Sequence, residues 1–538
     1  MSAMHLLRSH FVCGLLALIW FAAIPCPAAP APRPNIVFFL IDDLGYTDVS
    51  YHGGEIKTPN IDRLAAAGAK LEAFYVQPVC SPTRAALLTG RYPMRHGLQV
   101  GVVRPWANYG LPLDERTVAQ GLQAAGDTTA IIGNWHLGHF APESLPTRRG
   151  FTHQYGHYNG ALDYFTHERD GGFDWHRDDK VNRDEGYTTV LKGNEAVRLI
   201  EKQDSAKPLF LYMPFNAPHT PIQALPEHLK LYEHIENKQR RTYCAMVHAV
   251  DVEIGRVVAA IEKRGLTGNT LFIFSSDNGG PIAQGATNGK LRAGKGTLYE
   301  GGVRVSAFAT WAGKIKSGLL INEPLHMVDW YPTLLKLAGA QTEQKLVPDG
   351  LDIWPVLTAG AKSPHDAILL NTTPRNGAIR MGDWKLVLGG NLADNDDAPT
   401  PQPDDAKKSK KAKQAEPKSD SPGARVELFN LVEDISEKTN LADKFPDKVK
   451  ELRARLEAYA KQAVPPKSAP KAADFKTPKV WGRKTSDRSS EPYYEAIFPL
   501  SRVRVRAGHG SLCRGCPARV GAVGSRVAGS GARLAQVH

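Results

Sequence analysis

The sequence predicts an α/β fold in which a large, mostly parallel sheet is flanked by helices and followed by a smaller C-terminal α+β domain. Buried-strand patterns alternate with helical patterns from residue 34 to about residue 336. The chain of 538 residues is long enough for one large and one smaller domain. Its apolar content of 42% and charged content of 23% are ordinary for a globular protein, which argues against disorder over the whole chain.

The first two predicted elements are a strand and a helix. Residues 35–41 (Asn-Ile-Val-Phe-Phe-Leu-Ile) form a continuous apolar, β-branched and aromatic run, which is typical of a strand buried on both faces of a sheet. Residues 58–68 follow as a helix, in which Thr58 is the N-cap, Pro59 lies in the first turn and Gly68 marks the end. This pair opens the α/β alternation.

Three further buried strands and one long helix continue the alternation. The strands are predicted at residues 128–132, 208–212 and 270–274, which are short apolar runs rich in β-branched and aromatic residues. A helix over residues 241–264 precedes the last strand. Strands that alternate with helices in this way predict a mostly parallel sheet.

A second, smaller sheet is predicted after the main one. Residues 378–387 and 426–430 have strand patterns, and residues 447–460 form an amphipathic helix. Between the two strand patterns, residues 391–424 are rich in proline, lysine, aspartate and alanine and have no periodicity. We interpret them as a disordered surface insertion.

Both ends of the chain lie outside the predicted domains. Residues 1–31 have the pattern of a signal peptide, with an apolar run over residues 11–24 that is shorter than the ~20 residues a membrane-spanning helix needs. Export predicts a secreted or periplasmic protein without stable membrane insertion, and an uncleaved anchor is the alternative. Residues 484–538 are rich in arginine, glycine, serine and alanine and form a low-complexity tail that cannot build a core.

The net charge of +12 arises mainly outside the predicted domains. The last 38 residues hold seven arginines and no acid, and residues 406–418 hold six lysines and one glutamate. The remaining body is close to neutral, so no nucleic-acid partner is predicted. Of the six cysteines, only Cys80 and Cys244 lie in the body, which is too few for a disulfide framework, and Cys244 is interpreted as a buried apolar residue.

The segments that follow four predicted strands carry polar residues. In open α/β sheets, ligands bind beyond the carboxyl ends of the strands, so these residues are candidates for one site. Carboxylate and amide oxygens suit calcium or magnesium rather than zinc. Each of the pairs Asp42–Asp43 and Asp277–Asn278, taken alone, could instead cap a turn. Two such pairs at one edge of the sheet favour a metal site. The residues are Asp42 and Asp43, His136, His219, and Asp277 and Asn278.

Residues 78–92 predict a helix that begins at a cysteine. Pro82 suits the first turn, and the helix runs to about Leu88. Cys80 then lies at the helix N-terminus, where free backbone N–H groups favour an anion. Arg84, one turn further on, offers a bidentate fork for a tetrahedral oxyanion. The alternative is a cysteine that is merely buried.

The segment Cys-Ser-Pro-Thr-Arg-Ala-Ala-Leu-Leu-Thr-Gly-Arg, which starts at Cys80, resembles the sulfatase signature, in which Cys-x-Pro-x-Arg directs oxidation of the cysteine to formylglycine. The resemblance covers about residues 34–482 and is nearest to the arylsulfatase B (N-acetylgalactosamine-4-sulfatase) type. It implies an alkaline phosphatase-like fold, with a catalytic domain over residues 34–365 and a small domain over residues 366–483. Further matching stretches are residues 145–151, 163–168, 277–280, 298–304, 382–386 and 480–482.

The resemblance also implies an activity and a role for each candidate residue. The activity is hydrolysis of sulfate esters on a sulfated sugar or an aryl sulfate, after a formylglycine-generating maturation enzyme has acted. Calcium, or magnesium, would face the modified Cys80. Arg84 would stabilise the formylglycine hydrate, and His136 would accept its proton. His219 and Lys295 would bind the sulfate, and His219 would protonate the leaving alcohol. The metal ligands would be Asp42, Asp43, Asp277 and Asn278, with the modified Cys80.

One position departs from the family pattern. Residues 133–138 read Gly-Asn-Trp-His-Leu-Gly, so Asn134 stands where the family has a sulfate-binding lysine. This departure keeps open a weakly active enzyme or a non-catalytic binder of sulfated glycans. A phosphomonoester or phosphonate hydrolase of the same superfamily is the other alternative.

Overall fold

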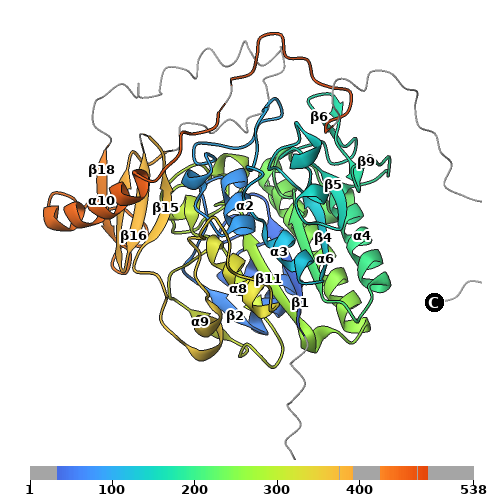
Figure 1. Ribbon diagram of the computed structural model, residues 1–538, viewed down its shortest axis with the longest axis horizontal. Helices are drawn as coiled ribbons and strands as arrows, with labels where there is room; N and C mark the ends of the chain where they lie inside the picture. Colours follow the sequence, from blue (N-terminus) through green and yellow to red (C-terminus); the bar gives the residue numbers. More distant parts are fainter. Residues whose placement is uncertain (1–32, 375, 392–424, 469, 483–538) are drawn as a thin grey trace, which may run out of the picture. The chain divides into compact units, whose positions relative to one another are not determined.

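The apolar runs of the sequence form parallel strands at the centre of a ten-stranded sheet (Figure 1). The structure is a computed structural model that describes residues 33–374, 376–391, 425–468 and 470–482. The four predicted strands are confirmed, and those at 128, 209 and 270 continue beyond their predicted ends. In sheet order, the central strands are β11 (Thr270–Ser276), β1 (Asn35–Ile41), β10 (Leu209–Phe215), β4 (Thr128–Asn134) and β5 (His153–His157).

Shorter strands extend the sheet at both edges and make it mixed. The pairs β11–β12, β12–β2, β5–β8 and β8–β9 are antiparallel, and β13 pairs with β2 in parallel. The prediction of an α/β fold with a mostly parallel sheet is therefore confirmed for the centre, where the site lies. The edge strands are β12 (Ala307–Thr310), β2 (Ala69–Leu71) and β13 (Leu319–Ile321) on one side, and β8 (His176–Arg177) and β9 (Lys180–Val181) on the other.

Helices cover both faces of the sheet, as the continuous apolar strands require. In β1, Phe38 packs into one core and Phe39 into the other. The predicted helices at 58–68 and 241–264 are confirmed as α1 and α6. The first core holds α2 (Cys80–Thr89), α3 (Val118–Ala124), α8 (Trp330–Leu337) and α9 (Trp354–Ala359), and the second holds α1 (Pro59–Ala66), α4 (Thr188–Lys202) and α6 (Lys238–Lys263).

The remaining short elements lie in the connections between these layers. They include one parallel pair of short strands, one antiparallel pair and two short helices. These elements are β3 (Phe74–Tyr75) with β14 (Leu325–His326), β6 (Glu168–Arg169) with β7 (Gly172–Phe173), α5 (Pro226–Lys230) and α7 (Glu300–Val303).

A separate four-stranded antiparallel sheet forms the predicted small α+β domain. The stretch predicted as one strand at 378–387 is a hairpin, because Gly382 (φ 56°) turns the chain between its two strands. The helix predicted at 447–460 is confirmed as α10 (Pro446–Ala460). Its Leu452 and Leu456 pack into the small core. The strands are β15 (Ile368–Thr372), β16 (Gly377–Met381), β17 (Trp384–Leu388) and β18 (Val426–Asn430).

Several predictions fall on residues that the structure does not describe. These are the signal peptide at 1–31, the insertion at 391–424 except its first residue, and the tail at 484–538. The domain boundary after residue 365 also stays a prediction. Within the described ranges, no helix combines the length and the apolar character needed to cross a membrane.

A buried ion cluster joins the four-stranded sheet to helix α7. Lys385 of β17 lies 2.9 Å from Glu300 of α7 and 2.8 Å from Glu437, and all three side chains are fully buried. The Glu300 backbone N–H also donates to Glu437, and Tyr75 donates to Glu300. Burial and the nearby Glu300 raise the pKa of Glu437 to about 7, although Lys385 opposes the shift. One lysine thus stands between two carboxylates.

The raised pKa of Glu437 predicts a loss of stability as pH rises. The folded protein keeps this proton to about pH 7, whereas the unfolded chain releases it near pH 4.5, so the free energy of unfolding falls across that window. Glu437→Gln stays neutral at every pH and avoids the loss. We expect it to be more stable than the wild type by about 1–3 kcal/mol at pH 8 and equal to it at pH 5.

Thermal unfolding at the two pH values measures this effect. Glu451→Gln, at an exposed position of α10, controls for the removal of one negative charge. If the unfolding temperatures of Glu437→Gln and the wild type differed by the same amount at pH 5 and pH 8, the raised pKa of Glu437 would be contradicted.

Candidate active site

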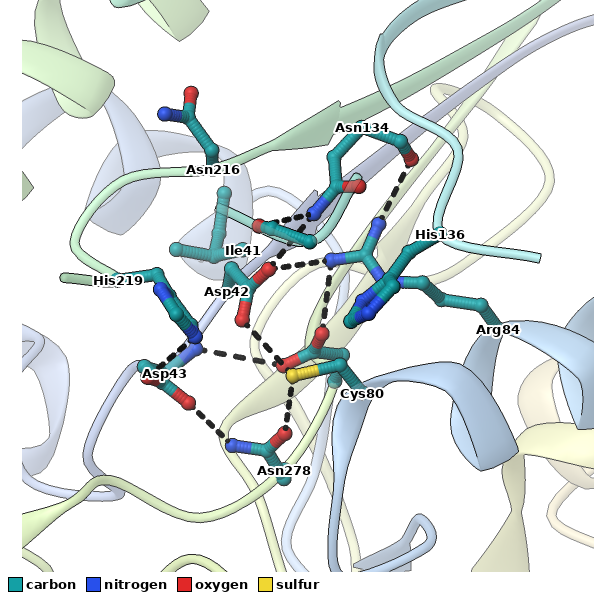
Figure 2. Close-up of polar contacts among 12 residues, drawn as sticks. Ile41, Asp42, Asp43, Cys80, Arg84, Asn134, His136, Asn216, His219 and Asn278 are labelled. Atoms are coloured by element: carbon teal, nitrogen blue, oxygen red, sulfur yellow. Dashed lines mark hydrogen bonds and ion pairs between the residues drawn. The ribbon is translucent and has the colours of Figure 1, made fainter. Parts of the chain in front are cut away.

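Two acidic pairs meet at the carboxyl ends of neighbouring strands (Figure 2). Strands β1 and β11 are parallel and adjacent, with Ile41 opposite Ser276, so the residues that follow them lie side by side. Asp42, Asp43, Asp277 and Asn278 are all fully buried. The Asn278 amide donates to Asp43 at 2.7 Å, and the Asp43 backbone N–H lies 3.4 Å from an Asp277 oxygen. The strand-end prediction thus brings both pairs to one place.

This group of side chains is suited to a divalent cation. Ligand atoms of Asp42, Asp43, Asp277 and Cys80 lie within 4.8 Å of one another. Burial, followed by repulsion from the nearby Asp42 and Asp43, raises the pKa of Asp277 to about 7, although Arg84 and Lys295 oppose the shift. A hard cation with oxygen ligands would relieve this repulsion. Asp43 has a positive φ of 70°, in the left-handed region that aspartate tolerates better than most residues.

Cys80 is the first residue of α2 and points into the carboxylate group. The helix runs over Cys80–Thr89, close to its predicted extent. The thiol sulfur lies 3.3 Å from an oxygen of Asp42 and 3.3 Å from the amide oxygen of Asn278. Burial, with Asp277 and Asp42, raises the pKa of the Cys80 thiol well above its usual range. The unmodified thiol therefore stays protonated and is a poor nucleophile.

Arg84 lies one turn along α2 and binds the carboxylates. One guanidinium nitrogen donates to Asp42 at 2.8 Å and to Asp277 at 2.9 Å, and another donates to the Asn134 carbonyl at 3.0 Å. Burial opposes the charge, but the two carboxylates outweigh it and raise the pKa of Arg84. The predicted fork is thus directed at Asp42 and Asp277, and it keeps two of the acidic groups in place.

His136 follows β4 and lies beside Arg84 and Cys80 (Figure 2). Its backbone has a positive φ of 53°, and its carbonyl accepts a hydrogen bond from Ser81 at 2.8 Å. Gly160 faces the imidazole, and a Cβ there would lie 2.2 Å from the ring. A glycine at position 160 is therefore needed to accommodate His136.

Asn134 is the last residue of β4 and is fully buried. Its side-chain amide donates to Asp42 at 3.1 Å and to the Gly160 carbonyl at 3.0 Å. Asn134 thus lies within the predicted site, where it holds a carboxylate. Its neutral side chain adds no positive charge.

His219 and Lys295 approach Asp43 from two different loops. Nε2 of His219 lies 3.7 Å from an Asp43 oxygen, and Nδ1 lies 2.8 Å from the Thr220 carbonyl. Nζ of Lys295 lies 2.9 Å from the other Asp43 oxygen. Burial raises the pKa of Asp42, but His219, Arg84 and Lys295 outweigh it, so the pKa falls below its usual value. All of the predicted site residues lie in this region.

Sequence reasoning missed residues that support the site from behind. Tyr164 donates to the carbonyls of Asn216 and His219 at 2.8 Å each, and Tyr243 donates to the Asp43 carbonyl at 2.9 Å. Lys192 of α4 is fully buried and bonds to Asn216. The sequence pattern that could have identified Lys192 is its position on the apolar stripe of a helix, four residues before Ala196.

Comparison with known proteins identifies the family. The sulfatase family profile matches residues 34–340. Arylsulfatase J of Mus musculus is 38% identical over 471 residues, which cover 82% of this chain and 78% of that protein. N-acetylgalactosamine-6-sulfatase of Mus musculus is 34% identical over 398 residues, which cover 69% and 75%. The predicted likeness to N-acetylgalactosamine-4-sulfatase is not tested by these matches and stays a prediction.

A solved structure agrees with the sequence matches. The crystal structure of Ps i-CgsB in complex with k-i-k-neocarrahexaose has a TM-score of 0.71 and 32% identity, and the match covers 81% of this chain and 94% of that chain. The chain belongs to the sulfatase family and is a sulfuric ester hydrolase with that family's α/β fold.

Proposed function

We propose that the protein hydrolyses sulfate esters with a formylglycine formed from Cys80, at a calcium or magnesium site. The observation that carries the proposal is the position of Cys80: it begins a helix, is fully buried and lies against both the acidic group and Arg84. The proposed metal ligands are Asp42, Asp43, Asp277 and Asn278, together with the modified Cys80.

The surroundings of Cys80 favour a modified residue over the thiol itself. A thiol that had attacked sulfur would carry no second hydroxyl group with which to expel sulfate. The hydrate of formylglycine would carry two hydroxyl groups: one attacks sulfur, and the other loses its proton to expel sulfate and restore the aldehyde. A residue with one hydroxyl lacks this second step.

On the side of residue 80, we assign charge stabilisation to Arg84 and the cation, and proton transfer to His136. Arg84 holds the two carboxylates and favours an oxyanion on residue 80. His136 is the proposed acceptor of the proton lost when sulfate leaves, because it lies beside residue 80 in Figure 2. A bound divalent cation would supply positive charge for the sulfuryl oxygens.

The opposite side of the site is assigned to the leaving alcohol. Protonated His219 would donate its Nε2 proton to the ester oxygen as the bond to sulfur breaks. Lys295, already close to Asp43, would hold a sulfuryl oxygen. Both groups are buried or nearly so, which strengthens their electrostatic effect.

A sulfated sugar or an aryl sulfate is the proposed substrate class. N-acetylgalactosamine-6-sulfatase among the relatives and the oligosaccharide complex among the solved structures support a sulfated glycan. We further propose export to the periplasm or cell exterior and modification by a formylglycine-generating enzyme. Turnover of paired sulfate and phosphate esters of the same phenol tests the reaction, because a phosphomonoester or phosphonate hydrolase would prefer the phosphate.

Asn134→Lys is expected to raise kcat for an aryl sulfate by about 10²–10³-fold. Asn134 donates hydrogen bonds but adds no charge, and one preorganised charged group contributes roughly this factor. The wild type is accordingly expected to be slow but active. Turnover of 4-nitrophenyl sulfate by both proteins measures the effect. Asn134→Gln, which is longer but neutral, should give no gain. A lysine variant no faster than the wild type would exclude a sulfate-binding role at this position.

A further inference from the structure

Lys192 of α4 is a fully buried lysine next to the active site, and the proposed reaction does not use it. It lies on the same helix face as Ala196 and Ile200, four and eight residues further on, and both of those belong to the apolar core. Within the described part of the chain, no carboxylate oxygen lies within 4.0 Å of its Nζ. A buried amine without a carboxylate partner is unfavourable, so another interaction must account for a lysine here.

The amine contacts two neutral polar groups and lies 5.8 Å from the centre of the Trp175 ring. Nζ donates to the side-chain oxygen of Asn216, and it lies 3.4 Å from Nε2 of His157. Nδ1 of His157 lies 2.7 Å from the Asn159 carbonyl, which assigns the proton to Nδ1 and leaves Nε2 as an acceptor. Burial and Arg84 lower the pKa of Lys192 well below its usual value, although Asp42 opposes the shift. The amine can make both contacts whether or not it is charged.

Asn216 connects Lys192 to the turn that carries His219. The Asn216 carbonyl accepts the His219 backbone N–H at 2.9 Å, so these residues are the first and last of one turn. Tyr164 donates to the carbonyls of both residues. In Figure 2 the Asn216 side chain points away from Cys80, which places it outside the proposed metal and nucleophile positions. Tyr164 thus holds the turn by its backbone, and Lys192, together with Thr188 at 3.4 Å, donates to the Asn216 side-chain oxygen.

We propose that Lys192 is a positioning residue for His219. It fixes the Asn216 amide, and the amide fixes the turn that keeps the imidazole Nε2 3.7 Å from Asp43. The inference rests on the proposed function, in which His219 protonates the leaving alcohol. Proton donation requires the imidazole to lie within hydrogen-bond reach of the ester oxygen, so a shifted turn weakens this step more than sulfate binding.

The dependence of kcat on the leaving group separates this role from a structural one. A leaving phenol of low pKa departs without a proton, whereas one of high pKa needs the acid. Lys192→Met keeps the length of the side chain and removes its hydrogen bonds. In a series of substituted phenyl sulfates, we expect kcat to fall by on the order of 10²-fold for the most basic leaving group and by less than about 3-fold for the most acidic.

Three further variants make the test specific. His219→Ala should show the same steep dependence, and Asn216→Ala should reproduce the Lys192→Met pattern. The double variant of Lys192 and Asn216 should add little to either single variant, since they act through one contact. Lys385→Met removes another fully buried lysine and should lower the unfolding temperature without changing the leaving-group dependence.

The possible failures are distinguishable. If His219→Ala does not steepen the leaving-group dependence, the acid role in the proposed function is wrong. If His219→Ala steepens it while Lys192→Met and Asn216→Ala reduce kcat equally for every phenyl sulfate, the positioning role of Lys192 is wrong. Should Lys192→Met fail to fold, the Asn216→Ala variant decides the question by the same measurement.

Discussion

Cys80→Ser is expected to lower kcat by on the order of 10⁶-fold, the scale seen when a covalent nucleophile is removed from a protease. Serine has a single hydroxyl, so it cannot expel sulfate by the route proposed for a formylglycine hydrate. Its side chain is close in size to the thiol and can make the same two hydrogen bonds, to Asp42 and Asn278, so the fold should be retained. Turnover of 4-nitrophenyl sulfate and the unfolding temperature measure the two effects.

The chemical state of residue 80 is the decisive companion measurement. Mass spectrometry of the peptide that contains Cys80, from protein made in its own host, should show formylglycine. Cys244→Ser is a matched control, because Cys244 is also a free, fully buried cysteine but lies in α6. That variant should remain active. Full activity in protein whose residue 80 is an unmodified thiol would falsify the proposed nucleophile.

Asp277→Ala, or removal of divalent cations with a chelator, is expected to lower kcat by at least on the order of 10³-fold. Asp277 is one of three buried carboxylates of the proposed metal site, with Asp42 and Asp43, and its removal takes away a ligand. Added calcium should also raise the unfolding temperature of the wild type, since a ligand at 100 times its Kd adds about 2.7 kcal/mol of stability. The Asp277→Ala protein should lose this calcium-dependent shift.

A buried aspartate outside the site provides the control. Asp251 of α6 accepts the backbone N–H groups of Asn60 and Ile61 and has no contact with the acidic group. Asp251→Asn should reduce stability but keep the calcium-dependent rise in unfolding temperature. A wild type whose activity and unfolding temperature are both unchanged by a chelator would rule out the metal site.

The position of the site could be predicted because its residues follow strongly patterned strands. Runs such as residues 35–41 and 270–274 are continuous enough to identify buried strands, and polar residues directly after them are expected at one sheet edge. The adjacency of β1 and β11 could not be predicted, because strand order depends on packing between distant segments. It is this adjacency that places Asp43 against Asp277.

Other features depend on tertiary contacts that leave little trace in local sequence. The positive φ values of Asp43 and His136 are imposed by the loops around them. The sequence predicts that Arg84 faces an oxyanion at residue 80, but its hydrogen bonds to Asp42 and Asp277 depend on contacts that only the folded chain makes. Lys192 lies on the apolar stripe of α4, but its partner Asn216 is 24 residues away and is brought to it only by the fold.

The central place of β1 has a consequence for biosynthesis. Ile36 pairs with Phe210, and Asn35 with Thr270, so the first strand to be synthesised finds its neighbours only after most of the catalytic region has emerged. Its apolar run must stay unpaired for that interval, which exposes the nascent chain to aggregation and makes folding slow. Since the Cys80 side chain is fully buried in the folded chain, the modification proposed above would have to act before folding is complete.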